Sequence, residues 1–186
     1  MQNKLIYLLG VKHSGKSTTG RELANLMNLP FIDMDTEIEK MTGMPVRRLF
    51  VEQGAEVFKQ AEAAVCEEIS YGCSQGIIAT GGGICSNPHA LAFLQKDAIK
   101  KKAHLVMLNL SEYEVCSRII AVSKERGSYP AYIAKGNPKN EEDVRRIFSS
   151  VYAERTSSYK EFCQIIIETD GKTPREISQE ILEAIN

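Results

Sequence analysis

Residues 10–17 read GVKHSGKS, which matches the phosphate-binding pattern G-x-x-x-x-G-K-[ST]. An apolar run, Leu5–Leu9, comes directly before this stretch, and a helix-like pattern with Leu23, Leu26 and Met27 follows it. A strand, a glycine-rich turn and a helix in this order point backbone N–H groups and a helix N-terminus at polyphosphate oxygens. We therefore expect a nucleotide to bind at this turn.

The residues of this loop have separate expected roles. Lys16 places a positive charge on the β- and γ-phosphates of ATP, which makes it an expected catalytic residue, and Ser17 is expected to ligate Mg²⁺. The glycines let the main chain turn tightly and approach the ligand. His13 occupies a variable position and is interpreted as a bystander. The expected ATP-binding residues here are Gly10, Ser14, Gly15, Lys16, Ser17 and Thr18.

Five short apolar segments recur along the chain, with helix-like patterns between them. They cover residues 5–9, 31–32, 77–79, 105–110 and 163–167. This alternation predicts a three-layer α/β/α fold with a five-stranded parallel sheet, in which each crossover passes through a helix. A chain of 186 residues suits one such domain, spanning 1–186.

Two connections are much longer than the roughly 12 residues that a parallel crossover needs. One runs from Ile32 to Ile77 and the other from Leu110 to Cys163. Both begin at carboxyl ends of strands, which is the edge where ligands bind in open α/β sheets. We expect the first to contain an acceptor-binding segment at about 34–62 and the second a mobile lid at about 119–140.

Two carboxylates, Asp33 and Asp35, follow the second expected strand at the sheet edge that faces the phosphate-binding loop. One interpretation makes Asp35 the N-cap of the next helix. In the other, one carboxylate holds Mg²⁺ through water and the other accepts a hydrogen bond from a substrate hydroxyl. Their position at this edge favours the second interpretation.

Three consecutive glycines, Gly81, Gly82 and Gly83, follow the third expected strand. Three in a row are costly in chain entropy, and a plain turn needs one or two. They indicate a backbone that passes close to a ligand. Farther along, Arg155 falls on the apolar stripe of the helix expected over 141–159, so it either reaches solvent at the helix end or faces a polar pocket.

Composition limits the classes of partner. Lys plus Arg number 23 and Asp plus Glu 24, giving a net charge of −1, which disfavours nucleic acid. The run Leu5–Leu9 is too short for a membrane span or a signal-peptide core, so we expect no membrane partner. Five cysteines without a CxxC pair indicate reduced thiols in a cytoplasmic protein. We also expect a monomer.

Along nearly its whole length the chain resembles the shikimate kinases, within the P-loop, nucleoside-monophosphate-kinase-like group. The resemblance rests on the ordered stretches GVKHSGKSTTGRELA, PFIDMDTEIEKMTG, LFVEQGAEVFKQAE, ATGGGI, ERTSSY and TDGKTPREI. It implies transfer of the ATP γ-phosphate to the 3-hydroxyl of shikimate, a step of the chorismate pathway to aromatic amino acids. It also implies a five-stranded parallel sheet, with Mg²⁺ and ATP at the site.

The resemblance further implies roles for single residues. Asp35 contacts the acceptor hydroxyls and is the best candidate for the base. Asp33 supports the Mg²⁺ shell together with Ser17. Arg118 and Pro174 enclose the adenine on two sides. Arg155 binds the acceptor carboxylate, and the implied acceptor site consists of Asp35, Lys59, Gly81, Gly82, Gly83 and Arg155.

Two positions depart from the family pattern. Lys59 stands where the family usually has arginine, and lysine keeps the charge but loses the fork that grips a carboxylate bidentately. The alternative for Lys59 is a surface pair with Glu56 or Glu62 on the same helix. The family lid normally reads Arg-Pro-Leu-Leu, with its arginine reaching the transferring phosphate, whereas this chain reads YPAY over 129–132.

Tyr129 therefore stands where a lid arginine is expected, and Lys124 or Arg126 is the candidate to replace it. Without a cation there, phosphoryl transfer loses an electrostatic contribution. These departures leave three hypotheses open: a shikimate kinase, which we favour; a kinase of the same fold for another hydroxy acid or polyol; and a regulatory module that binds nucleotide without catalysis.

Overall fold

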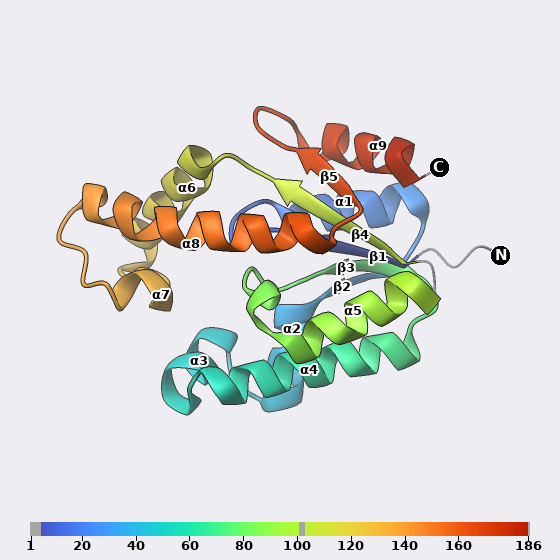
Figure 1. Cartoon of the computed structure of the whole chain (residues 1–186), viewed down its shortest axis with the longest axis horizontal. Coiled ribbons are helices and arrows are strands. Elements are labelled where there is room, and N and C mark those ends of the chain that lie inside the picture. The colour runs from blue at the N-terminus through green and yellow to red at the C-terminus, as the bar shows by residue number, and fades with distance from the viewer. Residues whose placement is uncertain (1–4, 101–102, 186) are drawn as a thin grey trace.

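A computed structural model describes residues 5–100 and 103–185, so it covers the expected domain of 1–186 without the remaining seven positions. A sheet of five parallel strands runs through it in the order β2-β3-β1-β4-β5. Helices cover both faces of the sheet (Figure 1). The predicted α/β/α fold is confirmed. The strands are β1 Leu5–Leu9, β2 Phe31–Asp33, β3 Gly76–Ala79, β4 His104–Asn109 and β5 Ile165–Glu168.

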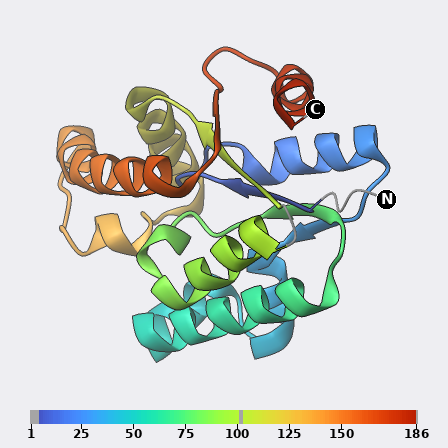
Figure 2. The ribbon, with the colours of Figure 1, turned by 45° about the vertical axis from the view of Figure 1, so that its right-hand side comes forward.

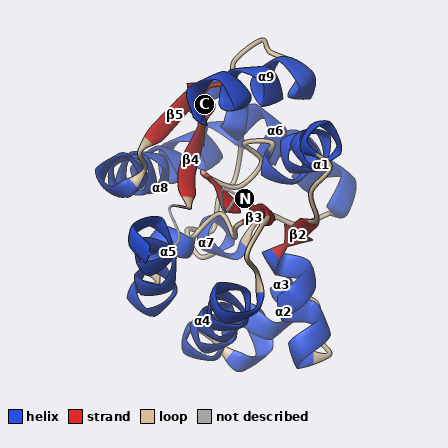
Figure 3. Cartoon of the chain, turned by 90° about the vertical axis from the view of Figure 1, so that its right-hand side faces the viewer, coloured by secondary structure: helices blue, strands red, loops and turns tan. Residues whose placement is uncertain are grey.

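The central strand β1 explains the two layers of helices. All five of its residues are buried, as its continuous apolar run requires of a strand covered on both faces. Leu5, Tyr7 and Leu9 belong to a large core cluster that includes residues of α4, α5, α6 and α8. Ile6 and Leu8 belong to a smaller cluster with residues of α1 and α9. Figure 3 shows the sheet edge-on between these layers.

The helices follow the expected pattern, and polar side chains cap several of them. They are α1 Lys16–Met27, α2 Met34–Thr42, α3 Val46–Gln53, α4 Ala55–Gly72, α5 Pro88–Lys100, α6 Glu112–Arg126, α7 Ala131–Ala134, α8 Glu141–Phe162 and α9 Pro174–Ile185. Thr173 and Glu176 form a reciprocal capping box at the start of α9. Asn140 caps α8 by accepting a hydrogen bond from the amide of Asp143.

The first long connection folds as three helices, α2, α3 and α4, beside the β2 end of the sheet (Figure 1). The expected acceptor-binding segment, 34–62, takes in α2, α3 and the first half of α4. Gly43 and Gly54 separate these helices, each with a positive φ that favours glycine. The segment is therefore a compact helical unit and not an extended loop.

The second long connection, between β4 and β5, contains the region that is expected to form a lid. Residues 119–126 are the second half of α6, and Ile119 and Ile120 are buried in the core. The helix ends at Gly127, whose φ of 68° permits the turn. The expected lid, about 119–140, would thus begin inside α6, because that helix continues to Arg126. The remaining loop carries the single turn α7, which lies on the side of α8 that faces α3 (Figures 1 and 2).

A buried carboxylate ties the sheet to two helices. Asp97 of α5 is fully buried and accepts hydrogen bonds from the Tyr7 hydroxyl at 2.7 Å and the Ser70 hydroxyl at 2.8 Å. Burial and the neighbouring Asp97 raise the pKa of Tyr7 far above its ordinary value, so the phenol stays a donor. The five cysteines are free thiols. Within residues 5–100 and 103–185, no helix is long and apolar enough to cross a membrane.

We predict that Tyr7→Phe lowers the free energy of unfolding by about 1–3 kcal/mol, because Asp97 loses a donor while it stays buried. Urea unfolding followed by circular dichroism measures the change. Tyr113→Phe is the matched control, since that side chain is 72% exposed. Equal stability of the two variants would contradict this role for the buried hydrogen bond.

Candidate functional site

The phosphate-binding loop connects β1 to α1 at the carboxyl edge of the sheet. A Cβ on Gly10 would lie 2.6 Å from the carbonyl oxygen of Leu108, so the neighbouring strand leaves room for glycine alone. Gly10 and Gly15 both have positive φ, 138° and 96°. The loop is thus shaped by its own backbone constraints and by its packing against β4.

Lys16 turns back into this loop. Its side chain is 8% exposed, and Nζ donates to the carbonyl oxygens of Gly10 at 2.8 Å and Val11 at 2.9 Å. Burial lowers the pKa of Lys16 to about 8, and the carboxylates of Asp35 and Asp33 oppose this shift. The ammonium therefore stands inside the loop, where phosphate oxygens can replace the two carbonyl partners.

Ser17 and Asp33 meet at the start of α2. The Ser17 hydroxyl donates to Oδ2 of Asp33 at 2.6 Å, and Oδ1 of Asp33 accepts from the amide of Asp35 at 3.1 Å. Asp33, with an extended backbone, is thus the N-cap of α2. The interpretation of Asp35 as N-cap is wrong, because the helix begins two residues earlier than that cap requires, at Met34.

This hydroxyl–carboxylate pair fits Mg²⁺. The ion prefers oxygen ligands and commonly takes only one or two protein groups together with water and substrate phosphate. The described residues contain no group of three or more His, Cys, Asp or Glu side chains placed to enclose a metal. Ser17 and Asp33 would hold Mg²⁺ in the way that nucleotide sites use it, beside a phosphate and not in a closed cage.

Asp35 faces the centre of the site from the first turn of α2. Burial and the neighbouring Asp33 raise the pKa of Asp35, whereas Lys16 and Lys12 oppose that shift. Its Oδ1 lies 3.6 Å from the point that a Cβ on Gly81 would occupy. Helix α2 therefore holds the Asp35 carboxylate beside both the phosphate-binding loop and the glycine turn.

Each glycine of the turn after β3 lies against a different part of the site. A Cβ on Gly81 would lie 2.7 Å from Oε1 of Glu62, and a Cβ on Gly82 only 2.6 Å from the amide nitrogen of Lys12. A Cβ on Gly83 would lie 3.2 Å from Nη2 of Arg155. These distances give a physical reason for three consecutive glycines: side chains would push apart the groups that the turn brings together.

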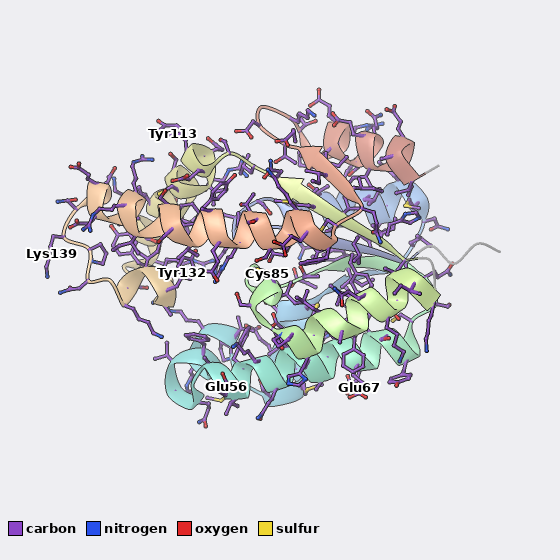
Figure 4. All side chains as sticks on the ribbon, in the orientation of Figure 1. Glu56, Glu67, Cys85, Tyr113, Tyr132 and Lys139 are labelled. Atoms are coloured by element: carbon purple, nitrogen blue, oxygen red, sulfur yellow. The ribbon has the colours of Figure 1, made fainter. Side chains whose placement is uncertain are left out.

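Arg155 of α8 points into this polar centre. Its Nη1 donates to the carbonyl oxygen of Gly82 at 3.0 Å, and the guanidinium lies 4.9 Å from the centroid of the Tyr132 ring. This contact with the glycine turn fits the interpretation in which Arg155 faces a polar pocket. Figure 4 labels Tyr132, on α7, and Cys85, just beyond the glycine turn; in that view both lie directly below α8.

Glu62 is a site residue that the sequence interpretation treated only as a surface partner of Lys59. It is 1% exposed, and its Oε2 accepts from Nδ2 of Asn87 at 2.9 Å. Oε1 is buried without a hydrogen-bond partner among the described residues. Burial raises the pKa of Glu62 to about 7. Its place one turn after Phe58, on the inner face of α4, was the signal that could have found it.

Lys59 forms an ion pair with Glu56, which is the surface pair that the sequence offers as the alternative to an acceptor contact. Its Nζ lies 3.6 Å from Oε1 of Glu56, whose side chain is 82% exposed. Its charge nevertheless acts on Glu62, whose pKa it lowers in opposition to burial. The structure therefore places Lys59 at the rim of the polar centre, and its contact with an acceptor carboxylate stays a prediction.

The two expected substitutes for a lid cation differ. Lys124 forms an ion pair with Glu141 at 2.6 Å, which ties it to the start of α8. The charge of Arg126 acts on Lys12 and His13 and lowers both pKa values. Arg126 therefore stands nearer the phosphate-binding loop, and Lys124 is engaged elsewhere.

The expected adenine contacts are brought only partly together. Arg118 donates from Nη1 to the carbonyl oxygen of His13 at 3.2 Å and pairs with Glu114 at 3.0 Å. Pro174 and Thr18 line a hollow of about 350 Å³ between α1 and the start of α9, whose lining does not include Arg118. Arg118 thus contacts the phosphate-binding loop. The joint contact of Arg118 and Pro174 with adenine stays a prediction.

The strand-loop-helix turn around Lys16, the paired carboxylates after β2 and the glycine turn after β3 define a P-loop kinase of the nucleoside-monophosphate-kinase-like class. Residues 12–186 match the family model described as shikimate kinase. The chain belongs to the shikimate kinase family, and it is a phosphotransferase that uses ATP and an alcohol acceptor.

Known proteins agree with this assignment. The chain is 32% identical over 180 residues to the shikimate kinase of Halorhodospira halophila, covering 97% of this chain and 92% of that one. It is 34% identical over 182 residues to the shikimate kinase of Thioalkalivibrio sulfidiphilus, covering 97% and 86%. The solved structure of a shikimate kinase from Acinetobacter baumannii in complex with shikimate matches with a TM-score of 0.81 and 27% identity, covering 98% and 92%.

The raised pKa of Glu62 predicts a pH-dependent stability. The folded chain holds this proton up to about pH 7, whereas an unfolded chain loses it near 4.5, so stability falls as the pH rises between these values. The loss amounts to up to about 3 kcal/mol. Glu62→Gln removes this slope in urea unfolding between pH 4.5 and 8. Glu67→Gln, an exposed position on the same helix, keeps it; identical profiles for the two variants would refute the assignment.

Proposed function

We propose that this chain transfers the γ-phosphate of ATP to the 3-hydroxyl of shikimate, with Lys16, Asp35 and Arg155 around the reacting groups. The observation that carries the proposal is the glycine turn, which lies within contact distance of the phosphate-binding loop, the second carboxylate and the arginine of α8. A kinase acting on a small carboxylated alcohol needs these groups within one substrate length.

On the nucleotide side, the N–H groups of residues 10–18 and the ammonium of Lys16 bind the phosphates. Ser17 and Asp33 would hold Mg²⁺, which would supply positive charge to offset that of the phosphates. Arg118 and Pro174 flank the adenine. The geometry that supports this half is the buried lysine and the 2.6 Å contact between Ser17 and Asp33.

On the acceptor side, Arg155 binds the carboxylate and Lys59 adds a second positive charge. Asp35 accepts the proton of the 3-hydroxyl, whose oxygen forms a bond to the γ-phosphorus. The bond from that phosphorus to the bridging oxygen breaks, and ADP leaves with the electron pair. The raised pKa of Asp35 makes this carboxylate a stronger base than an exposed one.

The residues around the site complete the proposal. The loop from 127 to 140, with α7, closes over Arg155 and excludes water, so that ATP is not hydrolysed. The acceptor-binding segment is 34–62, and the chain works as a single domain and a monomer. Five free thiols suit a reducing compartment, which supports the cytoplasm as its location.

The direct experiment measures ADP release from ATP with and without shikimate. Release that depends on shikimate supports the proposal. Release that depends instead on another hydroxy acid or polyol would favour the second hypothesis. ATP binding without release for any acceptor would favour a regulatory module.

Two variants test the assigned roles. Asp35→Asn is expected to lower kcat by about 10²–10⁴-fold while the dissociation constant of ATP stays within threefold, because only the proton acceptor is lost. Lys16→Ala is expected to abolish turnover, since the phosphate charge is no longer matched. Glu37→Gln, on the surface of the same helix as Asp35, serves as control. If Asp35→Asn weakens ATP binding as much as turnover, Asp35 is structural.

A further inference from the structure

Lys12 is the residue of the phosphate-binding loop to which neither the motif nor the family resemblance gives a role. Its backbone packs on the glycine turn: a Cβ on Gly82 would lie 2.6 Å from the Lys12 nitrogen, 2.9 Å from its Cα and 3.1 Å from its Cβ. Residue 12 thus lies where the nucleotide loop touches the acceptor turn. The residue keeps some exposure to solvent, while its surroundings partly desolvate the ammonium.

The charges around Lys12 are those of the reaction site. Partial desolvation lowers the pKa of Lys12, and the carboxylate of Asp35 opposes that shift. Arg126, Arg47 and Arg155 act in the other direction. Lys12 also lowers the pKa of Lys16, so the two ammonium groups repel each other across the loop. A phosphate group between two such cations relieves that repulsion.

Three other cations near the site have partners. Arg155 is bonded to the carbonyl oxygen of Gly82, and Lys124 is paired with Glu141. Arg47 donates from Nη2 to the carbonyl oxygen of Tyr129 at 3.3 Å. The segment 127–134 reads GSYPAYIA, so the part of the lid that covers Arg155 brings no cation of its own. Arg126 and Lys12 are then the cations left to match charge on the transferring group, and Lys12 lies on the loop that contacts the glycine turn.

We propose that Lys12 is a catalytic residue, which contacts the transferring phosphoryl group from the side of the acceptor and supplies the charge that Tyr129 does not. The inference rests on the proposed function. Lys16 approaches the β- and γ-phosphates from inside the loop, and Lys12 approaches the γ-phosphoryl from the glycine turn. Negative charge spreads over the equatorial oxygens in the transition state, so a second cation at this point acts on kcat.

The test separates kcat from binding. Lys12→Met is expected to lower kcat with shikimate by about 10²–10³-fold, with the dissociation constants of ATP and shikimate changed less than threefold. Lys12→Arg keeps most of the activity, because the charge is retained. Lys160→Met, at an exposed position in the last turn of α8, is the control for loss of one positive charge. Circular dichroism confirms that all variants are folded.

A second substitution makes the test specific to the missing lid charge. Adding Tyr129→Arg to Lys12→Met is expected to restore kcat at least tenfold, whereas Tyr129→Arg alone changes kcat less than threefold. A kcat of Lys12→Met within twofold of the unaltered chain would overturn the role of Lys12 and leave the proposed function intact. Absence of shikimate-dependent turnover in the unaltered chain would overturn both.

Discussion

The site is organised around one buried charge, the ammonium of Lys16, held by the carbonyl oxygens of Gly10 and Val11. An ammonium that is 8% exposed costs several kcal/mol to desolvate unless its hydrogens are bonded. The loop meets that requirement because β1 is fixed in the middle of the sheet and Gly10 packs against β4. The phosphate-binding geometry is therefore a consequence of the core as much as of the motif.

The second constraint is crowding at the carboxyl edge of the sheet. The turn after β3 fits between Glu62, Lys12 and Arg155 only because it has no side chains. The same crowding raises the pKa values of Asp35 and Glu62 and lowers those of Lys12 and Lys16. Carboxyl groups with raised pKa values and lysines with lowered pKa values therefore lie close together. Such a cluster is typical of sites that bind a charged ligand.

Much of the fold could be predicted from the sequence. Continuous apolar runs indicated strands that are buried on both faces, and the motif that contains Lys16 indicated a nucleotide-binding loop. The errors were local. The cap of α2 fell on Asp33 and not Asp35, because a carboxylate at either position fits the pattern. The sequence does not mark where the loop before α8 begins, because the helical pattern of α6 passes into the loop-like residues after Gly127 without a break before them.

Other site residues leave only a weak signal in the sequence. Glu62 looks like a surface acid on an amphipathic helix, and its burial depends on α4 packing beside the glycine turn and Asn87. Lys12 occupies a variable position of the motif, and its closeness to Gly82 follows from two loops that are distant in the chain. Such pairings are tertiary contacts, and hydrophobic periodicity predicts only local secondary structure.

The most direct test follows phosphorus nuclear magnetic resonance of ATP with this chain, Mg²⁺ and shikimate. The account predicts that the γ-phosphate signal is replaced by that of a new phosphate monoester, with little inorganic phosphate, and only when shikimate is present. Loss of the γ-signal to inorganic phosphate at the same rate with and without shikimate would contradict it.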